Sequence, residues 1–434
     1  MLRPLVAASL AVGVLGTAHA APSRASLSSY DVIALEIAYT TIMARYYKPV
    51  EPGALMDGAR TGLVAYLRGR GIAAPLLPPA ASHADKWSAE NAIDRDVALA
   101  VARYGTRVRT QDLVARTIAG ELAVLHDPYS VLFDPPSYKK FTGFLDARAS
   151  AGIGAELDVD PQTKAVRVVD VFPGSPAESA GLARGDLITA IDGRAPDTRV
   201  PAALALQLRG NAGTTVRIAY TRDGQPQPTL AIVRKTISAP DVLARMLAGN
   251  IGYIRIRSFG AQSPQQFDAA LARLTGAKAY VLDLRADGGG YRDAALAIAS
   301  HFVDGTIVTT QERGAAPQTF AAKAVAKIHA PLAVLVDGNT ASASEIVAGA
   351  IQDAHAGTLV GAKTFGKGLV QETFPLPSGG AIKLTTASYR TPAGRDIEGK
   401  GLVPDVLVEE PSGALLGEAG RDAQLDRALA LVRG

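Results

Sequence analysis

Ser342 is the residue whose position in the sequence most clearly suggests a reaction. It follows the apolar run 332–336, which predicts a buried strand, and it precedes a segment, 346–354, with few helix-breaking residues. A turn from a strand into a helix is a place where enzymes present nucleophiles. The backbone N–H of Ala343 would have no partner inside such a helix and could bind an anion. The pattern therefore predicts a nucleophilic hydroxyl beside a donor for a developing oxyanion.

Lys367 could be the base that a serine nucleophile requires. An ordinary lysine has a pKa near 10.4 and is charged at neutral pH, but burial can lower that pKa by up to about 3–5 pH units. Gly366 and Gly368 let the backbone pass close to other segments, and Phe365 can cover the amine. Gln371, four positions after the lysine, offers an uncharged amide that can orient the amine. A serine paired with a neutral lysine needs no histidine.

Taken alone, these residues allow a plainer interpretation. Ser342 could serve only as a helix N-cap, and Lys367 could be a surface lysine in a loop. Short matches of this kind are frequent by chance, so other parts of the sequence must decide.

Five ordered stretches resemble the carboxyl-terminal processing peptidases, the S41 family of secreted serine proteases, which have a Ser-Lys dyad and a PDZ domain. In the family the nucleophile precedes the lysine by 25 positions, which is the separation of Ser342 and Lys367. This spacing selects Ser342 over Ser344, which we interpret as structural. The resemblance covers nearly all of the mature chain. The matching stretches are 253–259, 282–285 with 288–290, 342–345, 365–371 and 389–394.

The resemblance implies a role for each matching site residue. Ser342 would be the nucleophile, Lys367 the general base and then the acid, and Gln371 the residue that orients the lysine. The oxyanion donors would be the backbone N–H groups of Ala343 and Gly289. Losing one such donor typically costs about 2.7–4 kcal/mol of transition-state stabilisation. The glycine turn, residues 288–290, is therefore expected to matter as much as the dyad.

Two further positions are compared with the family. Asp353, eleven positions after Ser342, matches an aspartate that we interpret as supporting rather than chemical, although a polar residue at a helix end is an equally good explanation. The stretch Ala286-Asp287-Gly288 departs from relatives, which often have an asparagine and a non-glycine residue before the paired glycines.

Residues 149–236 resemble a PDZ domain. Gly152, Ile153, Gly154 and Ala155 match its carboxylate-binding loop, where successive backbone N–H groups converge on an anion and the next strand edge pairs with an extended peptide. A second matching block, 185–193, supports the assignment, because a lone Gly-Ile-Gly is usually an ordinary turn. A free polypeptide C-terminus is the expected ligand.

The predicted fold class is multidomain α/β. Helical spacing predicts an N-terminal helical domain at 21–148, in which 71–111 is interpreted as an insertion with an exposed loop to about residue 88. By resemblance, 237–410 forms a peptidase core of the ClpP/crotonase type. The tail 411–434 has an amphipathic pattern that could cap the fold or join a partner chain.

Within the predicted core, apolar strands alternate with helices. Such alternation favours a mostly parallel sheet with a site at the carboxyl ends of its strands. The predicted strands are 251–256, 280–284 and 332–336, and the predicted helices are 264–274 and 292–302.

The first residues and the composition indicate export. Arg3, an apolar segment and a small-residue cleavage site predict a signal peptide at 1–20, although a retained anchor that associates the chain with a membrane is an alternative. The chain has no cysteine, so no disulfides support it. Six scattered histidines show no metal-ligand spacing, and a net charge of +4 without basic runs gives no case for nucleic acid. The expected location is periplasmic or extracellular.

The leading hypothesis is an exported serine endopeptidase that recognises polypeptide C-termini and cleaves through an acyl-enzyme. Its expected partners are polypeptides with free, apolar C-termini, and it requires no cofactor. Binding of an adaptor protein and formation of a homo-oligomer stay open. The alternatives are a catalytically inactive PDZ scaffold or adaptor and, last, an acyl-CoA hydrolase of the crotonase type.

Overall fold

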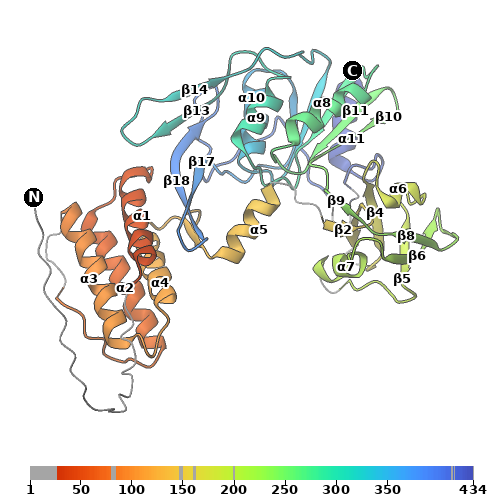
Figure 1. Ribbon diagram of the computed structural model, residues 1–434. Coiled ribbons are helices and arrows are strands. Elements are labelled where there is room, and N and C mark those ends of the chain that lie inside the picture. The colour runs from red at the N-terminus through yellow and green to blue at the C-terminus, as the bar shows by residue number, and fades with distance from the viewer. Residues whose placement is uncertain are drawn as a thin grey trace, which may run out of the picture. The chain divides into compact units, whose positions relative to one another are not determined.

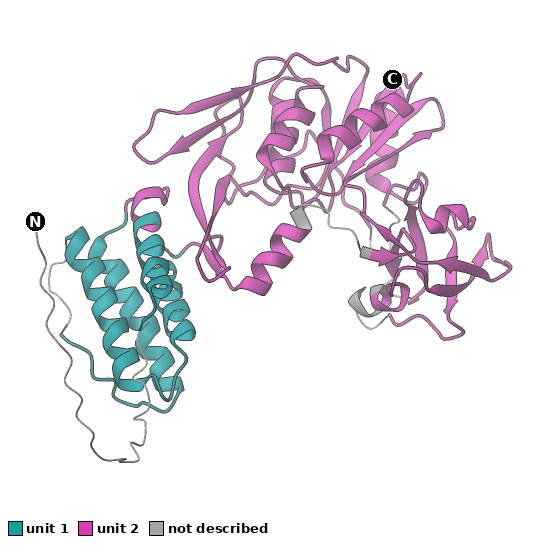
Figure 2. Cartoon of the chain, in the orientation of Figure 1, with its two compact units in different colours: residues 1–41, 50–126 teal, residues 42–49, 127–434 magenta. Residues whose placement is uncertain are grey.

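The computed structural model describes residues 27–79, 85–145, 150–159, 163–198, 201–411, 414 and 416–433. The chain forms two compact units, coloured separately in Figure 2. Unit 1 comprises residues 1–41 and 50–126, and unit 2 comprises residues 42–49 and 127–434. The predicted signal peptide, residues 1–20, lies outside the described residues.

Unit 1 is a bundle of helices (Figure 1). The helices pack through buried apolar side chains. Helices α2 and α4 approach so closely that only glycine fits between them: a Cβ atom on Gly120 would lie 2.1 Å from the carbonyl oxygen of Gly58. Leu63 and Leu113 are among the fully buried side chains. The helices are α1 (Ser29–Arg45), whose last residues belong to unit 2, α2 (Pro52–Gly69), α3 (Lys86–Tyr104) and α4 (Thr110–Ala123).

The stretch interpreted as an insertion, 71–111, contributes helix α3 to the bundle. Ile93, Val97 and Val101 of this helix are buried. The helix begins before the predicted end of the loop because Asp85 caps it, accepting hydrogen bonds from the N–H groups of Trp87 and Ser88, both at 2.9 Å. The described part of the stretch is therefore structural, and its interpretation as an insertion relative to the family stays a prediction.

Glu121 of α4 is a carboxyl group buried inside this bundle. Its side chain is 0% exposed, and neither carboxylate oxygen has a hydrogen-bond partner. Burial, with added repulsion from Asp94 and Glu90, raises the pKa of Glu121 well above its usual value. The bundle therefore favours the protonated form of this side chain.

Replacing Glu121 with Gln should remove a pH-dependent loss of stability from unit 1. Because the folded chain holds a proton that the unfolded chain releases above about pH 4.5, wild-type stability should fall as the pH rises. At pH 8 the Glu121→Gln variant should be more stable than the wild type by about 1–3 kcal/mol. Trp87, the only tryptophan, lies in α3, so urea unfolding followed by its fluorescence reports on unit 1.

A matched control is Asp57→Asn, which removes an exposed carboxyl group of α2 and should keep the wild-type pH dependence. If Glu121→Gln also kept that dependence, the charge of Glu121 would not be its source.

The PDZ-like part of unit 2 is an antiparallel sheet with the strand order β3-β4-β5-β6-β7, in which β8 also pairs with β6. Its core includes Ile153, Val168, Val216 and Ile218. The elements of this part are β2 (Ser150–Gly152), β3 (Ala155–Val159), β4 (Val166–Val171), α6 (Pro176–Ser179), β5 (Leu187–Ile191), α7 (Pro201–Leu208), β6 (Thr215–Arg222), β7 (Gln225–Pro226), β8 (Leu230–Val233) and β9 (Lys235–Ile237).

The remaining core of unit 2 is built on a six-stranded sheet with the order β10-β11-β12-β15-β16-β19. The strands are parallel from β11 onward, and β10 pairs with β11 in the antiparallel sense. The bounds are β10 (Val242–Leu247), β11 (Ile251–Ile256), β12 (Ala279–Asp283), β15 (Leu332–Val336), β16 (Thr358–Gly361) and β19 (Val406–Leu407). The predicted strands and the mostly parallel sheet are confirmed.

Helices cover both faces of this sheet. One apolar cluster joins α8, α9 and α10 to one face, and another joins α11 to the other face through Leu425 and Leu429. The predicted amphipathic segment of the tail therefore caps the fold. The helices are α8 (Ser263–Arg273), α9 (Arg292–Ala299), α10 (Ala343–Asp353) and α11 (Ala423–Arg433).

A third sheet has the order β1-β18-β13-β14, with β17 also paired to β18. Its strand β1 lies within the predicted helical domain 21–148 but pairs with β18 of the core, and unit 1 already ends at residue 126. The domain boundaries at 148, 236 and 410 stay predictions. The elements are β1 (Val131–Phe133), the adjoining α5 (Pro135–Leu145), β13 (Thr306–Glu312), β14 (Gln318–Ala321), β17 (Leu369–Pro375) and β18 (Ala381–Arg390).

Candidate active site

Ser342 lies at the turn from strand β15 into helix α10. All five residues of β15 are buried, and Ser342 is the N-cap residue of the helix. Its backbone has φ 58° and ψ −116°, a conformation that non-glycine residues rarely adopt. Strain of this kind persists only where the surrounding structure enforces it, and it is concentrated at functional sites.

The carboxylate of Glu345 holds this turn against the segment that carries Lys367. Its Oε2 accepts hydrogen bonds from the backbone N–H groups of Ser342 and Lys367, both at 2.9 Å. Its Oε1 accepts from the hydroxyl of Thr364 at 2.6 Å and from the N–H of Gly366 at 2.8 Å. Glu345 is 0% exposed, and hydrogen bonds to a buried carboxylate are strong. One side chain thus fixes both segments.

Tyr389 of β18 adds a second connection between the two segments. Its hydroxyl donates to the carbonyl oxygens of Lys367 at 2.6 Å and Ser342 at 3.1 Å. The glycines around Lys367 are needed for close packing, as predicted: a Cβ atom on Gly366 would lie 2.6 Å from the N atom of Gly401. One on Gly368 would lie 2.9 Å from the N atom of Glu398.

The amine of Lys367 lies in an environment that disfavours its charge. Burial, followed by repulsion from Lys383, lowers its pKa from 10.5 to about 8, although nearby carboxylates oppose the shift. The ring of Tyr129 covers the amine, with 5.0 Å between Nζ and the ring centroid. Phe365, the aromatic residue expected to do so, is 54% exposed, so that expectation was wrong. A neighbour distant in sequence takes its place.

Ser342, Lys367 and Gln371 line one pocket of about 320 Å³, together with Ala343 and Gly289. The structure therefore brings together five side chains or backbone groups that the sequence analysis named. The pocket lies where β12 and β15 end, since the glycine turn follows one strand and Ser342 follows the other. Sites in parallel sheets gather at this edge.

Gly289 packs directly against the candidate nucleophile. Its φ is 94°, and a Cβ atom there would lie 2.8 Å from the N atom of Ala343 and 2.9 Å from the Cβ of Ser342. The two backbone N–H groups expected to be oxyanion donors thus belong to residues that pack against each other in space. In the structure the N–H of Gly289 donates to Oδ1 of Asp287 at 2.8 Å.

Three other residues named in the sequence analysis make contacts away from the Ser342 hydroxyl and the Lys367 amine. The amide of Gln371 donates to the hydroxyl of Thr385 at 3.5 Å. Asp353 lies at the other end of α10 from Ser342, where it pairs with Arg395 and accepts the N–H of Ala393 at 2.8 Å, and it does not line the pocket. The hydroxyl of Ser344 is buried and donates to the carbonyl of Asp287, as its structural interpretation requires.

The sequence analysis missed the roles of Glu345, Tyr129, Lys383 and Tyr389. A signal for Glu345 was available, because a glutamate three positions after a serine N-cap commonly bonds the N-cap N–H. The other three come from segments distant in sequence, and nothing local indicates their contacts.

The predicted carboxylate-binding loop joins β2 to β3. Gly152 ends β2, and the side chain of Ile153 is buried in the core. Gly154 has φ 80°, and a Cβ atom there would lie 2.3 Å from the Cβ of Ser175, so the turn requires glycine. Ala155 begins β3, which pairs only with β4 among the described strands and leaves one edge open.

The residue after this loop is linked to the wall of the candidate active site. Glu156 pairs with Arg255 at 3.4 Å and with Arg257 at 3.2 Å. Arg257 lines the same pocket as Ser342. The strand expected to receive a peptide is thus joined to the pocket by the ion pair between Glu156 and Arg257.

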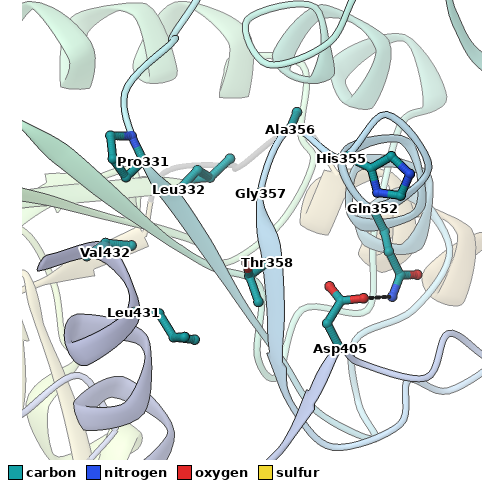
Figure 3. A pocket seen from close by; sticks show the side chains of 10 residues that line it. All are labelled: Pro331, Leu332, Gln352, His355, Ala356, Gly357, Thr358, Asp405, Leu431 and Val432. Atoms are coloured by element: carbon teal, nitrogen blue, oxygen red, sulfur yellow. Dashed lines mark hydrogen bonds between the residues drawn. The ribbon is translucent and has the colours of Figure 1, made fainter. Parts of the chain in front are cut away.

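A second pocket, of about 370 Å³, lies at the opposite edge of the core sheet (Figure 3). Its walls include the first residues of β15 and β16, and Gln352 donates to Asp405 there at 2.9 Å. The amino ends of parallel strands are not where their active sites form. None of the predicted site residues lines it.

Among the described residues, no group of three or more His, Asp or Glu side chains is arranged to hold a metal ion. In the same part of the chain, no helix combines the length and the apolar character needed to cross a bilayer.

Comparisons with known proteins identify the family. The model of peptidase family S41 matches residues 250–408, and that of the PDZ domain matches residues 152–231. The carboxyl-terminal-processing protease of Picosynechococcus sp. is 38% identical over 335 residues, which cover 75% of this chain and 80% of that protein. That of Synechocystis sp. is 36% identical, covering 75% and 78%. The structure of a photosystem II D1 C-terminal processing protease has a TM-score of 0.50 at 25% identity, covering 92% of this chain and 100% of that one.

The α/β core and its attached PDZ domain define a class of serine peptidases. The chain belongs to the carboxyl-terminal-processing proteases of peptidase family S41. The family resemblance and the multidomain α/β class predicted from the sequence are thereby confirmed.

Removing the charge of Lys383 should shift the pH dependence of peptide cleavage. Lys383→Gln takes away a positive charge that lowers the pKa of Lys367, so that pKa should rise. Activity below pH 8 should fall, and the acidic limb of kcat/KM should move up by roughly half to one pH unit. Lys383→Arg keeps the charge and should keep the wild-type profile. Superimposable profiles for all three enzymes would rule out this electrostatic coupling.

Proposed function

We propose that this protease cleaves polypeptides near their free C-termini, with Ser342 as nucleophile and Lys367 as general base, after its PDZ domain has bound the C-terminus. The observation that carries the proposal is the shared pocket. It is lined both by Ser342, at a strained helix entrance, and by Lys367, whose pKa is lowered to about 8. A base with a pKa close to the working pH is the most effective.

The proposed reaction has two stages. Neutral Lys367 takes the proton of the Ser342 hydroxyl as Oγ attacks the scissile carbonyl carbon, and the N–H groups of Ala343 and Gly289 bind the resulting oxyanion. The intermediate collapses, Lys367 gives its proton to the leaving amine, and an acyl-enzyme remains. Neutral Lys367 then activates a water, which hydrolyses the ester and restores Ser342. Gln371 orients the lysine.

The two reacting side chains must approach each other during this cycle. Among the described residues, no hydrogen bond joins Oγ of Ser342 to Nζ of Lys367. Catalytic hydrogen bonds are often long without substrate and shorten in the bound complex. The backbone connections through Glu345 keep the two residues within one pocket while their side chains move.

The open edge of β3 supports the PDZ part of the proposal. An extended peptide can add to such an edge as a further strand, with its terminal carboxylate at the Gly152–Ala155 loop. The ion pairs of Glu156 give this site a physical route to the catalytic pocket. We propose that the substrate ends in an apolar residue. We also propose an adaptor protein or a second copy of the chain as a further partner.

Export is part of the same proposal. The pattern of residues 1–20 is typical of a signal peptide, and the chain contains no cysteine that an oxidising compartment would pair. A periplasmic or extracellular location follows, with membrane association as the alternative if the segment is retained.

Replacing either dyad residue should abolish cleavage without unfolding the chain. Ser342→Ala and Lys367→Ala should each lower kcat/KM by at least about 10³-fold, because each removes an essential participant in acyl transfer. The measurement is cleavage of a casein-like protein and of a peptide with a free, apolar C-terminus. The same peptide with an amidated C-terminus should be cleaved more slowly, because it lacks the carboxylate for the PDZ loop.

Ser378→Ala and Lys363→Ala are matched controls, since both replaced residues are exposed. Wild-type turnover in both Ser342→Ala and Lys367→Ala would defeat the mechanism. Peptide binding without turnover in the wild type would favour an inactive scaffold instead.

A further inference from the structure

Asp287, directly before the glycine turn, has a buried carboxyl group that the proposed reaction does not use. It is 0% exposed. Its carbonyl oxygen accepts hydrogen bonds from the N–H of Ala341 and the hydroxyl of Ser344, both at 3.0 Å. These bonds fix Asp287 against the entrance of α10, next to the candidate nucleophile.

The side chain of Asp287 accepts a hydrogen bond from a backbone N–H that the proposed reaction needs. Its Oδ1 accepts the N–H of Gly289 at 2.8 Å, whereas its Oδ2 has no hydrogen-bond partner. Gly289 packs against Ser342 and Ala343, and its N–H is one of the two donors that the proposed mechanism gives to the oxyanion. A carboxylate that accepts this N–H competes with the oxyanion for the same donor. The negative charge of the carboxylate also repels the negative charge of the oxyanion.

The surroundings of Asp287 disfavour that negative charge. Burial is the main cause that raises its pKa to about 8, and the charge of Asp241, just before β10, acts in the same direction. The N–H of Gly289, the hydroxyl of Ser344 and the charge of Arg255 on β11 oppose the shift. The carboxyl group is therefore expected to lose its proton at a higher pH than an exposed aspartate does.

We propose that Asp287 is a positioning residue of the active site, which leaves the N–H of Gly289 to the oxyanion when its carboxyl group is protonated and withholds it when ionised. This inference rests on the proposed Ser-Lys mechanism and adds a second proton to it. A protonated carboxyl group is a weaker acceptor and carries no charge to repel the oxyanion.

The two protons act in opposite directions as the pH rises. Lys367 loses its proton and becomes a competent base, while Asp287 loses its proton and takes a donor from the oxyanion hole. The wild-type enzyme should therefore have a narrow activity maximum. Asparagine has nearly the same shape as aspartate and keeps an acceptor oxygen, but it cannot ionise.

The test is the pH profile of kcat and kcat/KM from pH 6 to pH 10 for the wild type, Asp287→Asn and the control Asp293→Asn. Asp293 is an exposed carboxyl group on α9. Above pH 8 the wild type and the control should lose activity by roughly tenfold or more, whereas Asp287→Asn should lose less than about twofold. The acidic limb should be the same in all three. An equal alkaline decline in Asp287→Asn and wild type, or no decline in the wild type, would overturn the proposal.

A measurement on the wild type alone keeps the proposal testable if Asp287→Asn does not fold. A peptide aldehyde adds the serine hydroxyl across its carbonyl group to give a tetrahedral adduct, and the peptide alcohol of the same sequence does not. The affinity for the aldehyde should fall between pH 8 and pH 10 more steeply than that for the alcohol, and parallel changes would overturn the role of Asp287. Ser342→Ala is the blank in every assay, so turnover by that variant would signal failure of the proposed mechanism rather than of Asp287.

Discussion

The carboxylate of Glu345 is the constraint on which the candidate active site depends. Ser342 and Lys367 are 25 positions apart and belong to different loops, yet both donate their backbone N–H to the same carboxylate oxygen. The other oxygen holds Thr364 and Gly366. A fully satisfied buried carboxylate specifies one arrangement of its donors, because each lost hydrogen bond would leave a buried charge underpaired. The strained backbone at Ser342 is maintained in this way.

The same burial that fixes the backbone controls the charges of the site. Burial, followed by repulsion from Lys383, lowers the pKa of Lys367 to about 8, while burial raises the pKa of Asp287 to about 8. Lys367 lines the pocket of Ser342, and Asp287 accepts the N–H of Gly289, which also lines it. Perturbed pKa values of opposite direction are characteristic of sites that perform acid–base chemistry.

Much of the fold could be predicted from the sequence, because strands such as 332–336 are continuous apolar runs whose burial depends on composition alone. Through the family resemblance, the spacing of Ser342 and Lys367 also selected two residues that line one pocket. Contacts made by distant segments could not be predicted: Tyr129, rather than the adjacent Phe365, covers the amine. The start of helix α3 was not predicted, because its cap, Asp85, follows a proline-rich stretch that signals a loop.

The proposed mechanism requires Lys367 to be largely uncharged at the pH at which this protease works. The most direct measurement is an NMR titration of the ε-carbon of Lys367 in protein labelled at lysine, with the signal assigned by its absence from Lys367→Ala. We predict a midpoint near pH 8. A midpoint close to 10.5, the value of an ordinary exposed lysine, would contradict the Ser-Lys mechanism.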